Sequence, residues 1–298
     1  IMLADTQKSP TLSLITKDVL LLTKARLTLS VVFSSMAGYL LAVPSPNMWH
    51  LLLLSVGGYG LAGASNVFNQ IIEKEIDAKM IRTQNRPIPA GRMSVPVAFG
   101  IAVMLLVLGL TVLYFLNPKT AMFGAISVFL YTCAYTPLKT ITPLSVFVGA
   151  IPGAIPFMLG WVSATGSFGL EPGILFMIQF FWQFPHFWAI GWMMHDDYQK
   201  AGINMLPTGK PDNATALQII LYTLWTIVIS IVPVFGISGA LQLSVVWATA
   251  VAAVGLVFLW AGLRLYKNHS IANAKKLMFV SIVYITAIQW IYVIDKFI

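Results

Sequence analysis

Three oxygen-bearing side chains recur at every fourth residue in one segment of the chain. Asn69, Glu73 and Asp77 are spaced i, i+4 and i+8, so on a helix that continues through Asp77 they stack on one face, about 6 Å apart along the axis. Asn66 falls on nearly the same stripe. Two carboxylates at this spacing repel each other, and a divalent cation such as Mg²⁺, which combines a few carboxylates with substrate phosphates, reverses that repulsion. The spacing predicts a metal–diphosphate site. The alternative is a solvated helix end whose acids balance neighbouring bases.

Basic residues follow this stripe. Arg82 and Arg86 lie one turn apart, and Pro87 ends the helix. Paired guanidinium groups suit phosphate oxygens, and lipid headgroups are the alternative partners. Lys139, at the end of a later apolar run, can also reach a phosphate, or it marks only the side of the membrane on which it lies.

A second acidic pair follows another apolar run. Asp196 and Asp197 come directly after residues 174–194. If both acidic segments lie on the same face of a membrane, they can clamp one diphosphate through Mg²⁺ from two sides. The two segments together therefore predict diphosphate chemistry more strongly than either one alone.

One histidine lies in the middle of an apolar run. His186 follows Pro185 directly, and an ionisable group at such depth is a functional residue by default because it is costly to keep in lipid. The alternative is a neutral imidazole that is hydrogen-bonded to Gln183 or to a carbonyl freed by the proline. Eleven residues separate His186 from Asp197, a rotation of only about 20° on a helix, so both can face one cavity.

Long apolar runs are the elements that must position these residues. The sequence is 58% hydrophobic and 9% charged, with a mean hydropathy of +0.83, whereas soluble domains carry roughly a quarter charged residues. Lipid must therefore be the solvent for much of the chain, and the single Cys133 excludes an internal disulfide framework. The prediction is an all-α, polytopic membrane protein with nine transmembrane helices near the ~20 residues that a bilayer requires, over residues 27–43, 51–69, 95–115, 120–135, 143–162, 174–194, 214–234, 243–265 and 277–294.

The charges indicate how these helices are oriented. With nine spans, sixteen of the eighteen Lys and Arg residues fall on the side of the N-terminus, an excess typical of cytoplasmic loops. The prediction is one membrane domain over residues 1–298, with a cytoplasmic N-terminus, an interfacial lead-in at 1–22, and cytoplasmic catalytic loops at 70–94 and 195–213. The net charge of +8 is then a topology signal, which argues against a nucleic-acid partner.

A transporter, which is not an enzyme, is an alternative from another class. It would carry acids or broken helices near the bilayer midplane, whereas both acidic clusters lie at the boundary of the bilayer.

These motifs together resemble a known family. Residues 69–87 resemble the first signature of the UbiA superfamily of intramembrane prenyltransferases. Residues 182–207 and 135–143 resemble motifs of its heme-prenylating branch, and the resemblance covers most of the chain. Two departures are Glu73, where the family usually has Asp, and Asn204, where Pro is common. The first departure keeps the carboxylate and adds one methylene.

The resemblance implies a fold, a reaction and partners. The fold would be a nine-helix bundle around a central cavity that is open to lipid and capped by the two acidic loops. The reaction would transfer a farnesyl group from farnesyl diphosphate to a vinyl group of protoheme IX, giving heme O and diphosphate, with handover to a heme A synthase or terminal oxidase. The bacterial inner membrane fits best, because no Arg- and Ser-rich transit peptide precedes the first span. A quinone-pathway enzyme that prenylates an aromatic acid is the nearest rival.

The resemblance also assigns roles to the residues above. The protein would use Mg²⁺ as its cofactor, because the charge that develops on a leaving diphosphate must be neutralised. His186 is the heme-side candidate, as iron ligand, propionate partner, proton handler or structural residue. The metal ligands would be Glu73, Asp77 and Asp197, with Asn69 as a further catalytic residue and with Asp196, Asn66, Arg82, Arg86 and Lys139 as substrate-binding residues.

Overall fold

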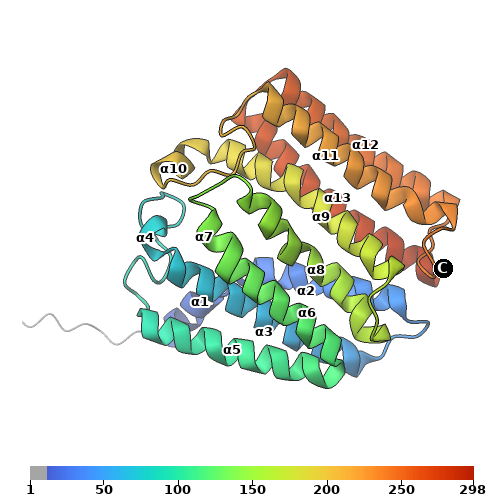
Figure 1. The fold of residues 1–298 in the computed structure, drawn as a ribbon, viewed down its shortest axis with the longest axis horizontal. Helices are drawn as coiled ribbons and strands as arrows, with labels where there is room; N and C mark the ends of the chain where they lie inside the picture. The colour runs from blue at the N-terminus through green and yellow to red at the C-terminus, as the bar shows by residue number, and fades with distance from the viewer. Residues whose placement is uncertain (1–11) are drawn as a thin grey trace, which may run out of the picture.

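The computed structural model describes residues 12–298, and within that range every regular element is a helix. Long helices run side by side through the molecule (Figure 1). Their bounds are α1 Leu12–Leu22, α2 Ala25–Ala42, α3 Met48–Ile72, α4 Lys74–Asp77, α5 Val95–Leu116, α6 Pro118–Phe129, a π-helical turn η1 Leu130–Tyr135, α7 Thr136–Leu138, α8 Ser145–Thr165, α9 Leu170–Met193, α10 His195–Lys200, α11 Asn213–Ile231, a 3₁₀ turn η2 Val232–Phe235, α12 Val245–Lys267 and α13 Ile271–Phe297.

Eight helical segments are long and apolar enough to cross a membrane. The remaining predicted span corresponds to α9, whose 24 residues suffice for about 36 Å. It carries Gln179, Gln183 and His186 and is not among these eight segments. The prediction of an all-helical, multi-pass membrane protein is therefore confirmed, while the count of nine spans, the central cavity and the cytoplasmic N-terminus stay predictions. The eight segments are Ala25–Ala42, Met48–Ile72, Val95–Leu116, Pro118–Leu138, Ser145–Thr165, Asn213–Phe235, Val245–Lys267 and Ile271–Phe297.

Side chains at the helix starts fix where the spans begin. The Asn47 side chain accepts hydrogen bonds from the first backbone N–H groups of α3, Asn117 does so for α6, and Asp212 does so for α11. Each satisfies a donor that has no partner inside its own helix. These three side chains thus mark where α3, α6 and α11 begin.

The helices pack closely where glycines face one another. A Cβ atom on Gly160 of α8 would collide with the Ser35 carbonyl of α2, and one on Gly38 would collide with the Phe157 carbonyl. In lipid, such small residues let two helix backbones approach and gain van der Waals contact. Because α8 also packs along α9, it joins the N-terminal helices to the C-terminal ones.

Two short acidic helices lie at the same end of the molecule, opposite the C-terminus (Figure 1). Each follows a long helix after a single residue that leaves helical geometry: Glu73 (φ −89°, ψ 10°) separates α3 from α4, and Met194 (φ −99°, ψ 12°) separates α9 from α10. The expected unbroken helix through Asp77 therefore breaks at Glu73. The N–H of Asp77 still donates to the Glu73 carbonyl at 2.7 Å, so the i, i+4 spacing of the acids is kept.

The lead-in of the chain is helical where the structure describes it. The predicted interfacial segment 1–22 includes α1, while its residues 1–11 lie outside the described range. Leu14, Ile15 and Leu20 of α1 are exposed, as a helix that lies against lipid requires. The interfacial position of α1 stays a prediction.

Candidate active site

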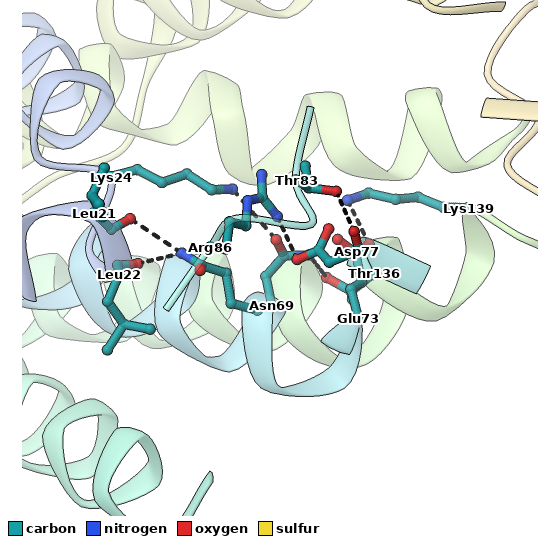
Figure 2. A network of polar contacts seen from close by, with 11 residues as sticks. Leu21, Leu22, Lys24, Asn69, Glu73, Asp77, Thr83, Arg86, Thr136 and Lys139 are labelled. Carbon is teal, nitrogen blue, oxygen red and sulfur yellow. Dashed lines mark hydrogen bonds and ion pairs between the residues drawn. The ribbon is translucent and has the colours of Figure 1, made fainter. Parts of the chain in front are cut away.

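The three residues of the predicted stripe converge at the end of α3. Asn69, Glu73 and Asp77 are only 1%, 5% and 0% exposed, and Figure 2 shows them side by side with basic side chains around them. Charged carboxylates are almost never buried so deeply unless they are paired. Their burial argues against the alternative of a solvated helix end.

Each carboxylate is paired with one of the predicted phosphate-binding residues. Arg86 Nη1 lies 2.6 Å from Asp77 Oδ2, and Lys139 Nζ lies 2.8 Å from Glu73 Oε1. Arg86 reaches back because the loop after α4 is folded onto the site, where Thr83 Oγ1 donates to the Asp77 carbonyl at 2.8 Å. The site thus holds two acids and two bases from three separate segments.

One oxygen at the centre of the site has no partner. Asp77 Oδ1 is buried and accepts no hydrogen bond among the described residues. Burial raises the pKa of Asp77, and the Arg86 guanidinium opposes that rise. A buried carboxylate oxygen of this kind is a ligand suited to a divalent cation, so the donor set fits Mg²⁺.

The predicted third metal ligand lies on the other acidic segment. Asp197 Oδ1 of α10 accepts a hydrogen bond from the Ile81 backbone N–H at 3.2 Å, which joins the two acidic loops. Among residues 12–298, no three acidic, histidine or cysteine side chains form a group that could hold a metal ion by themselves. Glu73 and Asp77 are therefore brought together, and Asp197 is not assembled with them into a closed cage. Asp196 is exposed.

The remaining loop contacts position the lysine of the site. The backbone N–H of Asn204 donates to the Lys139 carbonyl at 3.1 Å, which ties the second acidic loop to the end of α7. A cavity of about 330 Å³ lies beside this connection and is lined by residues of α10 and of segment 202–209. Arg82 is exposed and forms no ion pair or hydrogen bond within the described part of the chain.

The structure adds a residue that sequence reasoning missed. Lys24 joins α1 to α2 in a left-handed conformation (φ 48°), and its Nζ donates to Asn69 Oδ1 at 3.4 Å. Burial lowers the pKa of Lys24 to about 7, and the nearby Arg86 and Lys139 add to this effect. The sequence signal was weak, because a lysine just before the first apolar run looks like a topology marker.

The junction that carries Lys24 is held by α3. Asn66 Nδ2 donates to the Thr23 carbonyl at 3.3 Å and to Thr28 Oγ1 at 3.2 Å, and Gln70 Nε2 donates to the Leu22 carbonyl at 2.7 Å. The Asn66 amide therefore holds the α1–α2 junction against α3. Its predicted contact with substrate stays a prediction.

A π-helical turn completes the site. Within η1 and α7, Thr136 Oγ1 accepts from Asn69 Nδ2 at 3.1 Å, and the Tyr135 ring lies 4.5 Å from Lys139 Nζ. π-Turns are rare and frequently occur at functional sites. This turn aims both Thr136 and Lys139 at the end of α3, and no residue pattern predicted it.

His186 faces α13. Its Nδ1 lies 2.8 Å from Ser281 Oγ, and its ring stacks on Trp182. The Ser281 hydroxyl also lies 2.6 Å from the Met278 carbonyl; if it donates its hydrogen there, Nδ1 is the donor to Ser281 and Nε2 carries the lone pair. The alternative partner Gln183 donates to the Ala150 carbonyl instead. His186 and Asp197 thus have different neighbours, and no described contact joins them.

The fold and the site define an integral membrane protein with a buried ion-paired site at one end of its helix bundle, and comparison with known proteins gives its class. The profile described as the UbiA prenyltransferase family matches residues 31–283, so the chain belongs to that family and is a prenyltransferase. Among curated proteins, it is similar to protoheme IX farnesyltransferase of Christiangramia forsetii, with 64% identity over 93% of this chain and 92% of that protein. The enzyme of the same name from Flavobacterium psychrophilum is 60% identical over 97% of both chains.

Solved structures share the fold at low sequence identity. A structure described as digeranylgeranylglyceryl phosphate synthase has a TM-score of 0.78 with 18% identity over 95% of this chain and 98% of that one. A UbiA homolog from Archaeoglobus fulgidus, bound to GPP and Mg²⁺, has a TM-score of 0.68 with 14% identity over 93% of this chain and 99% of that one. These likenesses establish the UbiA fold for the present chain.

Proposed function

We propose that this protein transfers the farnesyl group of farnesyl diphosphate to a vinyl group of protoheme IX. The allylic carbon–oxygen bond breaks and diphosphate leaves. A carbon–carbon bond forms to one vinyl carbon, water adds its hydroxyl to the other, and a proton is released, which gives heme O. The observation that carries this proposal is the 64% identity over 277 residues with a protoheme IX farnesyltransferase.

The buried acids and bases at the end of α3 support the donor half of the reaction. Glu73, Asp77 and, from the other loop, Asp197 would hold Mg²⁺. When bound, the ion would neutralise charge on the leaving diphosphate. The fold neighbour from Archaeoglobus fulgidus that binds GPP and Mg²⁺ supports this assignment.

The basic residues would act on the diphosphate itself. Arg86, Lys139 and Lys24 come from three segments and converge on one point (Figure 2). Fixed N–H donors at the place where charge develops stabilise a transition state without reorganisation. Arg82, which is exposed beside them, would add a further contact when the loop closes over substrate. The surrounding burial keeps water from the allylic cation.

His186 would serve the acceptor half of the reaction. The Ser281 contact through Nδ1 would hold the ring, and a neutral imidazole with its lone pair on Nε2 is the form that ligates a metal or accepts a proton. An imidazole of fixed orientation inside an apolar span suits a flat, hydrophobic acceptor with a central iron. The other candidate acceptor, an aromatic acid, gives this residue no role.

The setting that we propose is the bacterial inner membrane, with both acidic loops on the cytoplasmic side. Bacterial relatives of the same name support this location. The heme O product is hydrophobic and stays in the bilayer, so a heme A synthase or terminal oxidase would receive it there.

A turnover assay tests donor, acceptor and metal together. Purified protein in nanodiscs receives protoheme, farnesyl diphosphate and Mg²⁺, and the extracted hemes are analysed by mass spectrometry. We expect a heme that has gained farnesyl plus water, and we expect EDTA to abolish it. Asp77→Asn, which keeps the shape of the side chain, should lower kcat/KM by about 10²-fold or more.

The control for this assay is Glu75→Gln. Glu75 lies two residues from Asp77, but its side chain is 79% exposed and, among residues 12–298, pairs with Lys74 alone, so turnover should stay near that of the wild type. If folded protein leaves heme unmodified and prenylates an aromatic acid, the family assignment stands and the proposed acceptor is wrong.

A further inference from the structure

An apolar groove lies on the outer face of the N-terminal helices. It has a volume of about 270 Å³ and is lined by Leu29 and Val32 of α2, Ser55 and Tyr59 of α3, and Leu105 and Leu108 of α5. Leu29 is 58% exposed and Leu108 is 47% exposed, so the groove opens on the side that faces lipid. Its size and lining suit part of one acyl chain.

The groove is connected to the active site by hydrogen bonds. The Tyr59 hydroxyl lies 3.1 Å from Thr23 Oγ1 and shares a hydrogen bond with it, and Thr23 Oγ1 also lies 3.0 Å from the Val19 carbonyl. Lys24 follows Thr23 directly and reaches Asn69. Tyr59 of the groove and Lys24 of the site are thus linked through Thr23.

A free cation lies near the groove. Arg26 is exposed at the start of α2, one turn before Leu29, so both side chains project from the same side of the helix. Within residues 12–298 it forms no ion pair or hydrogen bond, whereas Arg86 and Arg92 are each paired with an aspartate. An arginine beside an apolar groove at a membrane boundary complements a lipid phosphate.

We propose that this groove binds one anionic phospholipid of the leaflet on the side of α4 and α10. One acyl chain lies in the groove, and the headgroup phosphate pairs with Arg26. The bound lipid stabilises the α1–α2 junction, which sets Lys24 toward the diphosphate. The effect on turnover rests on the proposed prenyl-diphosphate site, whereas lipid binding itself does not. Thr23 is a positioning residue in this scheme.

Two measurements on the full-length protein test the proposal separately. Native mass spectrometry, without substrates, measures how much phosphatidylglycerol stays bound after purification. Turnover is then measured in nanodiscs of phosphatidylcholine alone and of phosphatidylcholine mixed with phosphatidylglycerol. We expect phosphatidylglycerol to raise kcat/KM for the prenyl diphosphate about fivefold, at the lower end of typical couplings between sites, mainly through KM.

Two variants and one control locate the effect. Arg26→Gln should lose the bound lipid and the activation while keeping its turnover in phosphatidylcholine. Ser55→Leu, which fills the groove, should lose the bound lipid. Lys267→Gln removes an exposed charge in the last turn of α12, away from the groove, and should keep both effects.

The outcomes distinguish this proposal from the proposed reaction. Equal loss of activation in Lys267→Gln and Arg26→Gln would mean that surface charge alone is responsible, and would overturn the lipid site. Retained lipid in both Arg26→Gln and Ser55→Leu would overturn it as well. Bound lipid that depends on Arg26, in a protein that does not prenylate heme, would leave the lipid site intact and refute the reaction.

Discussion

Glu73 and Asp77 each give one carboxylate oxygen to a basic side chain, and those two bases come from different segments. A bound diphosphate would compete for the N–H donors of Arg86 and Lys139, while a divalent cation would compete for the carboxylates. A cation that binds the carboxylates would free Arg86 and Lys139 for the diphosphate. A diphosphate that binds those two bases would free the carboxylates for the cation. Such an exchange would let a site rich in both charges be buried in the protein and still accept a highly charged substrate.

Lys24 allows a prediction about pH. Its pKa in the folded protein is about 7, below its ordinary value of 10.5. Between these two values the unfolded chain binds more protons than the folded one, so the free energy of unfolding rises with pH across that window. Lys24→Met should remove this rise, melt at a higher temperature than the wild type at pH 7, and raise KM for farnesyl diphosphate about tenfold through loss of one charged contact.

Thermal unfolding followed by tryptophan fluorescence, at pH 7 and at pH 9, measures the first effect, and steady-state turnover measures the second. Lys79→Met is the control, because Lys79 is exposed in the loop after α4 and, within residues 12–298, its side chain forms no ion pair with Glu73 or Asp77. A variant at Lys24 that keeps the pH dependence of the wild type would show that this lysine is not the group responsible.

At the scale of helices, the sequence predicted most of what the structure contains, because apolar runs mark what lies in lipid. The predicted span 95–115 corresponds to α5, Val95–Leu116. The last predicted span, 277–294, is shorter than α13, Ile271–Phe297, because hydropathy counts Lys275 and Lys276 against the helix although backbone hydrogen bonds continue through them. Composition thus finds the membrane-embedded part of a helix better than its ends.

Features that depend on tertiary contacts were not predictable in the same way. The i, i+4 spacing identified Asn69, Glu73 and Asp77 because it is local. The hydrogen bond between Asn69 and Thr136, which follows the π-turn, joins residues 67 positions apart, and the one between Lys24 and Asn69 joins residues 45 positions apart. No local sequence pattern indicates such pairings. The spacing of Arg82 and Arg86 likewise does not predict that Arg86 forms an ion pair with Asp77 while Arg82 is exposed.

The contact between α2 and α8 gives a prediction at the same scale. Gly160→Ala places a methyl group against the Ser35 carbonyl, and the two backbones must separate to admit it. We expect a loss of about 1–3 kcal/mol in the free energy of unfolding, as for other overpacked contacts, measured as a lower melting temperature in detergent. Gly100→Ala in α5 is the control, since a Cβ there meets no atom within 4 Å. Equal melting of both variants would contradict a close α2–α8 contact.

At the scale of the whole molecule, the chemistry is concentrated at one end. The acidic helices α4 and α10 lie there together (Figure 1), and the Ile81–Asp197 hydrogen bond joins their loops. The helices between them and the C-terminus expose large apolar side chains such as Phe115 and Val246 to the surroundings, as lipid-facing helices must. A charged donor can therefore enter from water at that end, while its hydrophobic tail and a hydrophobic acceptor enter from the bilayer.

This arrangement requires the end with α4 and α10 to face the cytoplasm, which thiol labelling can test. The single native cysteine, Cys133, is exposed and is first replaced by serine. Lys79→Cys then places one thiol in the loop after α4, and Lys119→Cys places one in the first turn of α6 at the opposite end. A membrane-impermeant maleimide should label only Lys119→Cys in intact spheroplasts, and only Lys79→Cys in inside-out vesicles. Labelling of Lys79→Cys from outside would place the acidic loops on the wrong side for a cytoplasmic diphosphate. The excess of Lys and Arg residues at that end would then reflect the binding site alone and not the preference of cytoplasmic loops for positive charge.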